Sequence, residues 1–383
     1  MPFSDIARAA EDRFHADIIP ALRRRGWRPR VIPFEGYGSA AGPPEGAGPQ
    51  KGNEMARVLG RMVMRPKDAP SEGPLFRSLP EKLPGSAADA RDLAMTSILE
   101  AQRGWRLFVD VPVPYLPVTV TVGGSRVRTR ADRGGYVNVV VRGHGLAPGW
   151  HQAKIDAAGA GAVSARVLVV APGPRLGIVS DIDDTAMVSH VPRVLVAAWN
   201  QLVKHSLARE PVPGMAELLT RIQQTHPGTP MVYLSTGAWN VVPTLRSFFK
   251  RNGFPDGPKL MTDWGPTNTG WFRSGIEHKR TELRRLMIDL PEVRWLLVGD
   301  SGQHDPLIYG EAAREHSDRI AAIAIRRLTP AQQVLAGGIT VHPMGLGPEA
   351  RTLAEADVPV VVGGDGYELA RLLPRDIMTP PSH

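Results

Sequence analysis

Beyond residue 175 the sequence alternates short apolar runs with longer amphipathic segments, and this order restricts the possible folds more than any other feature. Strands are predicted at LGIVS, MVYLS, RWLLVGD, IAAIAI and VPVVVGGD. Helices are predicted at MAELLTRIQQTH, VVPTLRSFFKRNG, EHKRTELRRLMIDL, DPLIYGEAAREH and GYELARLL. Apolar strands that alternate with amphipathic helices predict an α/β fold with a parallel sheet covered on both faces. Ligands of such folds bind beyond the carboxyl ends of the strands.

The chain before this point follows a different pattern. Residues 1–30 are predicted to form an N-terminal helix, and residues 31–172 hold short strand-like runs between Gly, Pro and Asp turns. A turn at Asp132–Gly135 is predicted to join SRVRTR and YVNVVV in a hairpin. Strands of this length and spacing predict a β-sandwich-like N-terminal domain. The segment Ala171–Arg175 is the predicted linker to a second domain over residues 173–383.

Charge and composition restrict the partners and the location of the chain. Residues 1–174 carry 24 Lys and Arg against 16 Asp and Glu, whereas residues 175–383 carry 22 of each. This basic first half favours anionic partners such as lipid headgroups, nucleic acid or phosphorylated substrates, or else serves solubility. The absence of cysteine excludes disulfides and cysteine nucleophiles. With no signal-like N-terminus and no long apolar run, we expect no transmembrane helix and a cytoplasmic location, at most peripheral to a membrane.

Three aspartates gather within four residues in DIDDT, which begins at Asp181 directly after a predicted strand. The side chains of Asp181 and Asp183 lie on one side if the strand continues extended, because successive side chains alternate. Carboxylates this close need a cation, and hard oxygen ligands without cysteine favour Mg²⁺. Since Ser235, Lys279 and Asp300 also follow or flank strand ends, we expect them at the same edge of the sheet.

DIDDT resembles motif I of the haloacid dehalogenase (HAD) phosphatases, DxDx[TV], and three further motifs follow in the order that this superfamily uses. MVYLSTG resembles motif II, EHK before a helix resembles motif III, and LLVGDSGQHD resembles motif IV. The longer strings YLSTGAWN, TDWG and GDSGQHDPLIY are similar to the App-type phosphatidate phosphatase catalytic domain, named for the fungal actin-patch phosphatase. The resemblance covers roughly residues 175–330. It implies a HAD-like Rossmannoid fold with a small cap insertion at about 186–212.

The same resemblance implies a role for each matched residue. Asp181 would attack phosphorus and form an aspartyl-phosphate, Asp183 would act as acid and then base, and Lys279 would stabilise the phosphoryl charge. Lys259 is the rival to Lys279 for this last role. The predicted ligands of Mg²⁺ are Asp181, the backbone carbonyl of Asp183, Asp300 and, through a water, Asp305. The predicted substrate-binding residues are Thr185, Ser235, Thr236 and Gly237.

The predicted function is Mg²⁺-dependent hydrolysis of a phosphomonoester, with phosphatidate at a membrane surface as the substrate. One alternative is a HAD phosphatase that acts on a soluble or nucleic-acid end phosphate and is recruited by the basic β-rich domain. Another is a non-catalytic binding module, against which the intact DxDxT argues. An amphipathic helix is predicted at 190–206. It has three alternative roles, which are to cap the site, to contact lipid or to pack on its own domain. The sequence leaves these alternatives open.

Overall fold

The structure, a computed structural model, describes residues 19–42, 54–66, 111–188, 210–262, 271–302, 304–329, 352–353 and 355–380. The chain divides into two compact units. One, named here the β-rich unit, comprises residues 1–36, 56–144 and 152–167, and the α/β unit comprises residues 37–55, 145–151 and 168–383. The domain boundaries at 31–172 and 173–383 stay predictions.

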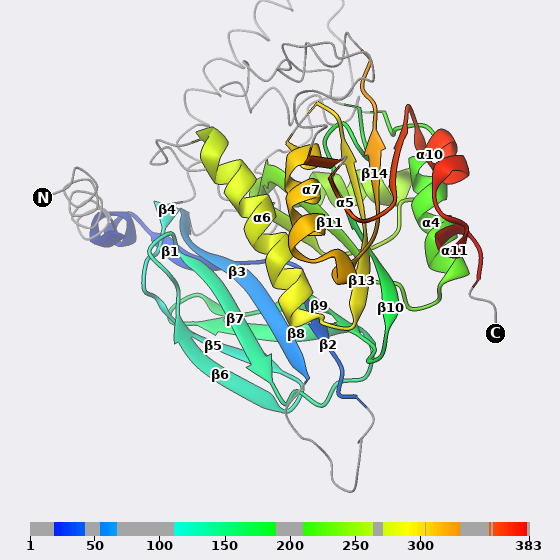
Figure 1. The fold of residues 1–383 in the computed structure, drawn as a ribbon. Coiled ribbons are helices and arrows are strands. Elements are labelled where there is room, and N and C mark those ends of the chain that lie inside the picture. The colour runs from blue at the N-terminus through cyan, green and yellow to red at the C-terminus, as the bar shows by residue number, and fades with distance from the viewer. Residues whose placement is uncertain are drawn as a thin grey trace, which may run out of the picture. The chain divides into compact units, whose positions relative to one another are not determined.

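Nine strands of the described residues form the sheet of the first part of the chain (Figure 1). They are β1 (Trp27–Pro33), β2 (Gly36–Ser39), β3 (Met55–Pro66), β4 (Val111–Pro112), β5 (Pro117–Val122), β6 (Ser125–Arg130), β7 (Tyr136–Arg142), β8 (Gly149–Ala157) and β9 (Gly161–Val170). Their order is β1-β3-β2-β9-β8-β5-β6, with β4 and β7 paired to β3. The predicted β-sandwich is not confirmed. All nine strands belong to one hydrogen-bonded network, since the 12-residue β3 is long enough to pair with several strands.

The predicted hairpin between SRVRTR and YVNVVV is confirmed in its turn and wrong in its strand pairing. β6 pairs with β5 through a two-residue turn at Gly123 and Gly124, whereas β7 pairs with β3. Gly123 has a φ of 52°, which suits the tight turns that join neighbouring antiparallel strands. The segment from Asp132 does turn the chain, because its carboxylate accepts the Tyr136 N–H at 2.7 Å. This turn brings β7 back beside β6, since the Ser125 hydroxyl donates to the Gly143 carbonyl at 2.6 Å, although the strand that pairs with β7 is β3.

The predicted parallel sheet is confirmed in the α/β unit. The six strands found among its described residues run in the order β12-β11-β10-β13-β14-β15, and every neighbouring pair is parallel. They are β10 (Arg175–Ser180), β11 (Met231–Ala238), β12 (Lys259–Thr262), β13 (Val293–Asp300), β14 (Ile320–Arg326) and β15 (Val360–Gly363). β10 and β13 are the central pair.

Helices cover both faces of this sheet (Figure 1). They are α4 (Met215–Thr225), α5 (Val242–Arg251), α6 (Trp271–Asp289), α7 (Asp305–Glu315), α10 (Gly366–Leu372) and α11 (Arg375–Met378). α4, α5, α10 and α11 pack on the face that carries Ile178, Leu296 and Val298. α6 and α7 pack against each other, with α6 against β11 and α7 against β13. α6 begins at Trp271, before its predicted start at Glu277.

Two predicted elements fall largely outside the described residues. The N-terminal helix is described only from residue 19, and the insertion at 186–212, with its helix at 190–206, is described only at its two ends. These ends lie side by side, because the Val188 N–H donates to the Glu210 carbonyl and the Val212 N–H to the Ala186 carbonyl.

None of the helices in the described part of the chain has the length and apolar character to span a membrane.

Candidate active site

The site begins where the two central strands of the parallel sheet end. β10 and β13 are in register, with Ser180 opposite Val298, and the Asp181 N–H donates to the Val298 carbonyl at 2.9 Å. Asp181 therefore lies at the same edge of the sheet as Asp300, the last residue of β13. Both side chains are buried. The local sequence explains this placement, because each aspartate directly follows an apolar run that fills the centre of the sheet.

Lys279 connects the aspartates of this edge. From α6 its ammonium donates to Asp181 Oδ1 at 2.7 Å and to Asp305 Oδ1 at 2.6 Å. Asp305 begins α7, and its Oδ2 accepts the backbone N–H of Asp300 at 3.3 Å. Three segments that are distant in sequence thus converge, those of Asp181, Lys279 and Asp300–Asp305, and all four side chains are buried. The structure brings together the predicted residues Asp181, Lys279, Asp300 and Asp305.

The three carboxylates could hold a metal ion. Asp181, Asp300 and Asp305 each offer an oxygen, and these oxygens lie within 4.8 Å of one another. Asp181 Oδ2 and Asp300 Oδ2 are buried without a hydrogen-bond partner in the described part of the chain. Buried carboxylate oxygens with no donor are costly, so a missing cation is the simplest partner for them. An all-oxygen set of few ligands suits Mg²⁺, which keeps several of its waters.

The charges of the site also favour the binding of a further cation. Burial raises the pKa of Asp181 to about 7 despite the opposing attraction of Lys279, and Asp305 and Asp183 add to the rise. Burial likewise raises the pKa of Asp300 well above its ordinary value, with Asp305 and Asp181 contributing. Burial alone would lower the pKa of Lys279, but Asp181 and Asp305 raise it, so the ammonium stays charged. If the three carboxylates were all ionised, the single lysine would leave a surplus of negative charge, which a further cation could offset.

Gly299 lets the edge pack this closely. A Cβ at this position would lie 2.5 Å from Asp305 Oδ2 and 2.7 Å from Cε2 of Tyr309. The Tyr309 hydroxyl in turn donates to the Val298 carbonyl at 3.2 Å. Any side chain at Gly299 would therefore displace Asp305 from Lys279. The first glycine of the GDSGQHD string is therefore required, because a larger residue would not fit at this position.

A second group of predicted residues gathers around Asp183. Ser235 Oγ, on β11, donates to Asp183 Oδ2 at 3.3 Å and accepts the Gly237 N–H at 2.9 Å. The Thr236 carbonyl accepts the Thr262 hydroxyl at 2.9 Å. Thr185 is fully buried, and its hydroxyl has no hydrogen-bond partner among the described residues. The structure thus brings Asp183, Ser235 and Gly237 together and places Thr185 in the interior.

Lys259, the rival to Lys279, lies in a different environment. Its ammonium donates to the Gly257 carbonyl at 2.8 Å and lies 5.6 Å and 5.7 Å from the ring centroids of Tyr233 and Phe249. Such cation–π contacts stabilise a buried lysine beside β12. The lysine that contacts Asp181 is therefore Lys279.

The sequence analysis missed Arg326, the last residue of β14. This buried guanidinium donates through Nη1 to the Asp184 carbonyl at 2.6 Å and through Nε to the Gly364 carbonyl at 3.3 Å. Asp184 has a φ of 60°, a left-handed conformation that non-glycine residues rarely adopt. Arg326 therefore connects the DIDDT segment, which follows β10, to the end of β14, two strands away in the sheet. The available signal was an arginine that directly ends the apolar run IAAIAI.

Comparisons with known proteins agree with these motifs. Phosphatidate phosphatase APP1 of Saccharomyces cerevisiae is 26% identical over 152 residues, which is 39% of this chain and 26% of the yeast protein. An uncharacterized Schizosaccharomyces pombe protein, C29B5.04c, is also 26% identical, over 155 residues and 25% of its length. The chain thus matches about a quarter of the length of these curated relatives.

A solved structure gives a weaker likeness. The HAD domain of the effector protein Lem4 from Legionella pneumophila aligns with 41% of this chain and 88% of that domain, at 14% identity and a TM-score of 0.28. A score this low carries no argument about the fold. The family comparison is more direct: residues 176–327, which hold β10 to β14 and all the site residues above, match the family described as phosphatidate phosphatase APP1, catalytic domain.

Proposed function

We propose that residues 176–327 form a HAD-type phosphatase that hydrolyses a phosphomonoester of the phosphatidate type with the help of Mg²⁺. The observation that carries this proposal is the cluster at the sheet edge. Lys279 bridges Asp181 and Asp305 at 2.7 Å and 2.6 Å, while Asp181 and Asp300 each keep one buried oxygen without a partner. A nucleophilic carboxylate, a fixed cation and free oxygen ligands are the groups that phosphoryl transfer requires.

The proposed metal ligands are Asp181, Asp300 and the backbone carbonyl of Asp183, with Asp305 oriented beside them. The N–H of Gly302 donates to Asp300 Oδ1 at 2.7 Å, which fixes the carboxylate and leaves Oδ2 for the ion. When bound, Mg²⁺ would neutralise charge on the phosphoryl oxygens and on the carboxylates around them. The oxygens assigned to the ion include Asp181 Oδ2 and Asp300 Oδ2, whose burial without a partner destabilises the fold when no cation is bound.

The proposed reaction has two displacements. In the first, a carboxylate oxygen of Asp181 attacks phosphorus, the bond from phosphorus to the ester oxygen breaks, and Asp183 donates a proton to the departing alkoxide. In the second, a water gives its proton to Asp183 and its oxygen attacks phosphorus, which releases inorganic phosphate and restores Asp181. Lys279 would stabilise the charge on the equatorial oxygens in both steps. Ser235, held by the Gly237 N–H, orients Asp183.

A substrate panel tests the proposed substrate class. We expect phosphate release from phosphatidate in mixed micelles, and we expect chelation of divalent ions to abolish it. Soluble sugar phosphates and a 3′-phosphorylated oligonucleotide should be poor substrates under the same conditions. Faster turnover of either soluble class would reject the lipid assignment, and no release from any ester would reject the phosphatase itself. The proposal includes a location in the cytoplasm or at a membrane surface.

Mg²⁺ should stabilise the folded chain through Asp300. At about 100 times its dissociation constant a ligand adds roughly 2.7 kcal/mol, which corresponds to a rise in Tm of about 5–10 °C for a unit of this size. Asp300→Asn should lose this rise, since it removes a ligand oxygen. Without metal the variant should melt no lower than the unsubstituted chain, because a buried charge with a raised pKa has been removed. Thermal unfolding with and without Mg²⁺ measures both effects.

Asp318→Asn is the matched control for this experiment. Asp318 is exposed and pairs only with the adjacent Arg319 among the described residues, so its substitution should leave the Mg²⁺-induced rise unchanged. If Asp300→Asn keeps the full rise in Tm, the metal binds elsewhere and the assigned ligand set is wrong.

A further inference from the structure

One face of the β-rich unit carries a row of arginines. β6 places Arg126, Arg128 and Arg130 at every second position, and all three are exposed. Residues two apart on a strand point to the same side, about 7 Å from each other. The intervening Val127 and Thr129 are opposite the buried Val120 and Val118 of β5, so the arginines point away from the core.

Cross-strand pairing extends this row across the neighbouring strands. Arg126 is opposite Thr121 of β5, which is opposite the exposed Lys154 of β8. Arg128 is opposite Thr119, and Thr119 is opposite Asp156, the one carboxylate among these cross-strand pairs. We define the arginine face as Arg126, Arg128, Arg130 and Lys154. β6 stands at the end of the strand order, where Figure 1 draws it along the border of the unit.

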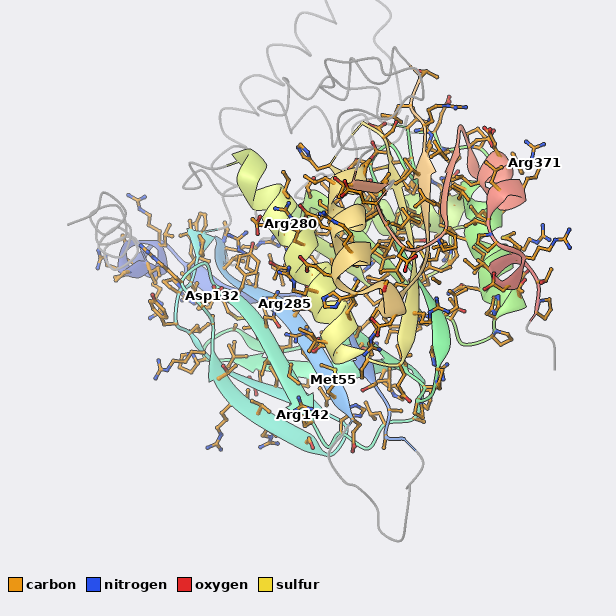
Figure 2. The ribbon with its side chains drawn as sticks, in the orientation of Figure 1. Met55, Asp132, Arg142, Arg280, Arg285 and Arg371 are labelled. Carbon is orange, nitrogen blue, oxygen red and sulfur yellow. The ribbon has the colours of Figure 1, made fainter. Side chains whose placement is uncertain are left out.

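These cations are not neutralised by other described residues. Arg126, Arg128 and Lys154 make no ion pair or side-chain hydrogen bond within the described ranges, and Arg130 makes one bond, to the Tyr115 carbonyl at 3.3 Å. On α6, by contrast, Arg280 pairs with Glu311 of α7, and Figure 2 labels this arginine on the helix. Unpaired cations repel one another, so a row of them fits an external anionic partner.

Tyr115 adds an amphipathic side chain at the Arg130 end of the row. It is 51% exposed, more than most large apolar side chains of the described residues, and its φ of 58° is rare for a bulky residue. Strained backbone of this kind persists where the surroundings hold it, here through the bond from Arg130. Tyrosine favours the boundary between water and lipid, where the ring is buried and the hydroxyl stays hydrated.

We propose that the arginine face, together with Tyr115, docks the chain on an anionic phospholipid bilayer. A guanidinium group can donate two parallel hydrogen bonds to one phosphate, and a row of exposed cations on one side of the sheet can contact several headgroups at once. Single-stranded nucleic acid is usually held by aromatic side chains interleaved with cations, and this face has one aromatic residue at its end. The inference rests on the proposed function, since a substrate embedded in a bilayer is what makes such docking useful.

The test is sedimentation of the full chain with vesicles of phosphatidylcholine alone and of phosphatidylcholine with phosphatidylserine. The chain should bind the anionic vesicles, and more weakly at higher salt. Replacement of Arg126, Arg128 and Arg130 by Gln should weaken this binding on the order of 100-fold, given the usual contribution of each basic residue near such a surface. Tyr115→Ser leaves the charge unchanged and should weaken vesicle binding about tenfold, because it removes the ring that would be buried in the bilayer.

A matched triple variant removes the same charge from the α/β unit. Arg221, Arg371 and Arg375 are exposed on α4, α10 and α11, and Figure 2 shows the Arg371 side chain extending from its helix into solvent. Their replacement by Gln should change vesicle binding less than about threefold, because the screened long-range attraction is small. Both triple variants should melt like the unsubstituted chain, since exposed side chains contribute little to stability.

Three results would overturn this inference. The first is equal binding to neutral and anionic vesicles, and the second is an equal loss of vesicle binding in the two triple variants. The third is tight binding of a single-stranded oligonucleotide that requires the arginine face, while vesicle binding does not require it. Sedimentation measures binding without turnover. A chain that docks through this face but releases no phosphate would therefore reject the proposed function and leave the docking surface in place.

Discussion

Lys279→Met should destabilise the metal-free protein by about 3–5 kcal/mol and abolish phosphate release. The lysine is the shared partner of Asp181 and Asp305, at 2.7 Å and 2.6 Å, and all three side chains are buried. Methionine fills the space of the alkyl chain but leaves two carboxylates without a cation. Urea unfolding with a chelator present measures the loss of stability.

The pH dependence of this loss separates charge from packing. Without the lysine, which lowers the pKa of Asp181, this carboxyl group should take up a proton more readily, so the destabilisation should be smaller at pH 5 than at pH 8. Lys250→Met, at an exposed position of α5, is the matched control and should change stability by less than about 0.5 kcal/mol. A pH-independent loss in Lys279→Met would mean that packing, not charge, explains the effect.

Asp181→Asn should reduce turnover on the order of 10⁴-fold or more while leaving the fold intact. The amide oxygen can still accept from Lys279, so the hydrogen bond at this position survives. An amide, however, is a poor nucleophile, and no acyl-phosphate can form on it. The variant should be at least as stable as the unsubstituted chain without metal, because burial raises the pKa of Asp181 and penalises its charge.

Trapping of the intermediate tests this assignment directly. The unsubstituted chain, quenched in acid during turnover of a phosphorus-32 ester, should carry label that hydroxylamine releases, and Asp181→Asn should carry none. Asp318→Asn, which removes an exposed carboxylate, should be labelled normally. Full activity in Asp181→Asn would reject the proposed mechanism.

The α/β unit was predictable because its periodicity is local. Apolar runs and amphipathic segments alternate, and each of the described strands β10, β11, β13, β14 and β15 lies where such a run predicted it. The β-rich unit was harder, since strand partners are decided by contacts far along the chain. The turn at Asp132 was recognised correctly, but nothing local to YVNVVV indicates that its strand pairs with β3.

The sequence predicted which residues form the site, but it did not predict which of them contact each other. Asp181 directly follows β10 and Asp300 ends β13, and a parallel sheet brings such ends to one edge. Ser235 lies within β11 and Lys279 within α6, so their places were less certain from the sequence. The sequence could not specify that Lys279 bridges two carboxylates, because that depends on how α6 packs. Arg326 was missed because it contacts the backbone carbonyl of Asp184, a partner with no sequence signature.

The register of the two central strands determines when during folding the site can assemble. Asp181 and Asp300 meet only when Ser180 pairs opposite Val298, although about half of the α/β unit's residues lie between them. Closing a loop of that length costs conformational entropy, and contacts between residues near in sequence do not remove this cost. Nascent chains that end before β13 lack Asp300 and Asp305, two of the three clustered carboxylates, so the candidate site cannot form until the sheet is nearly complete.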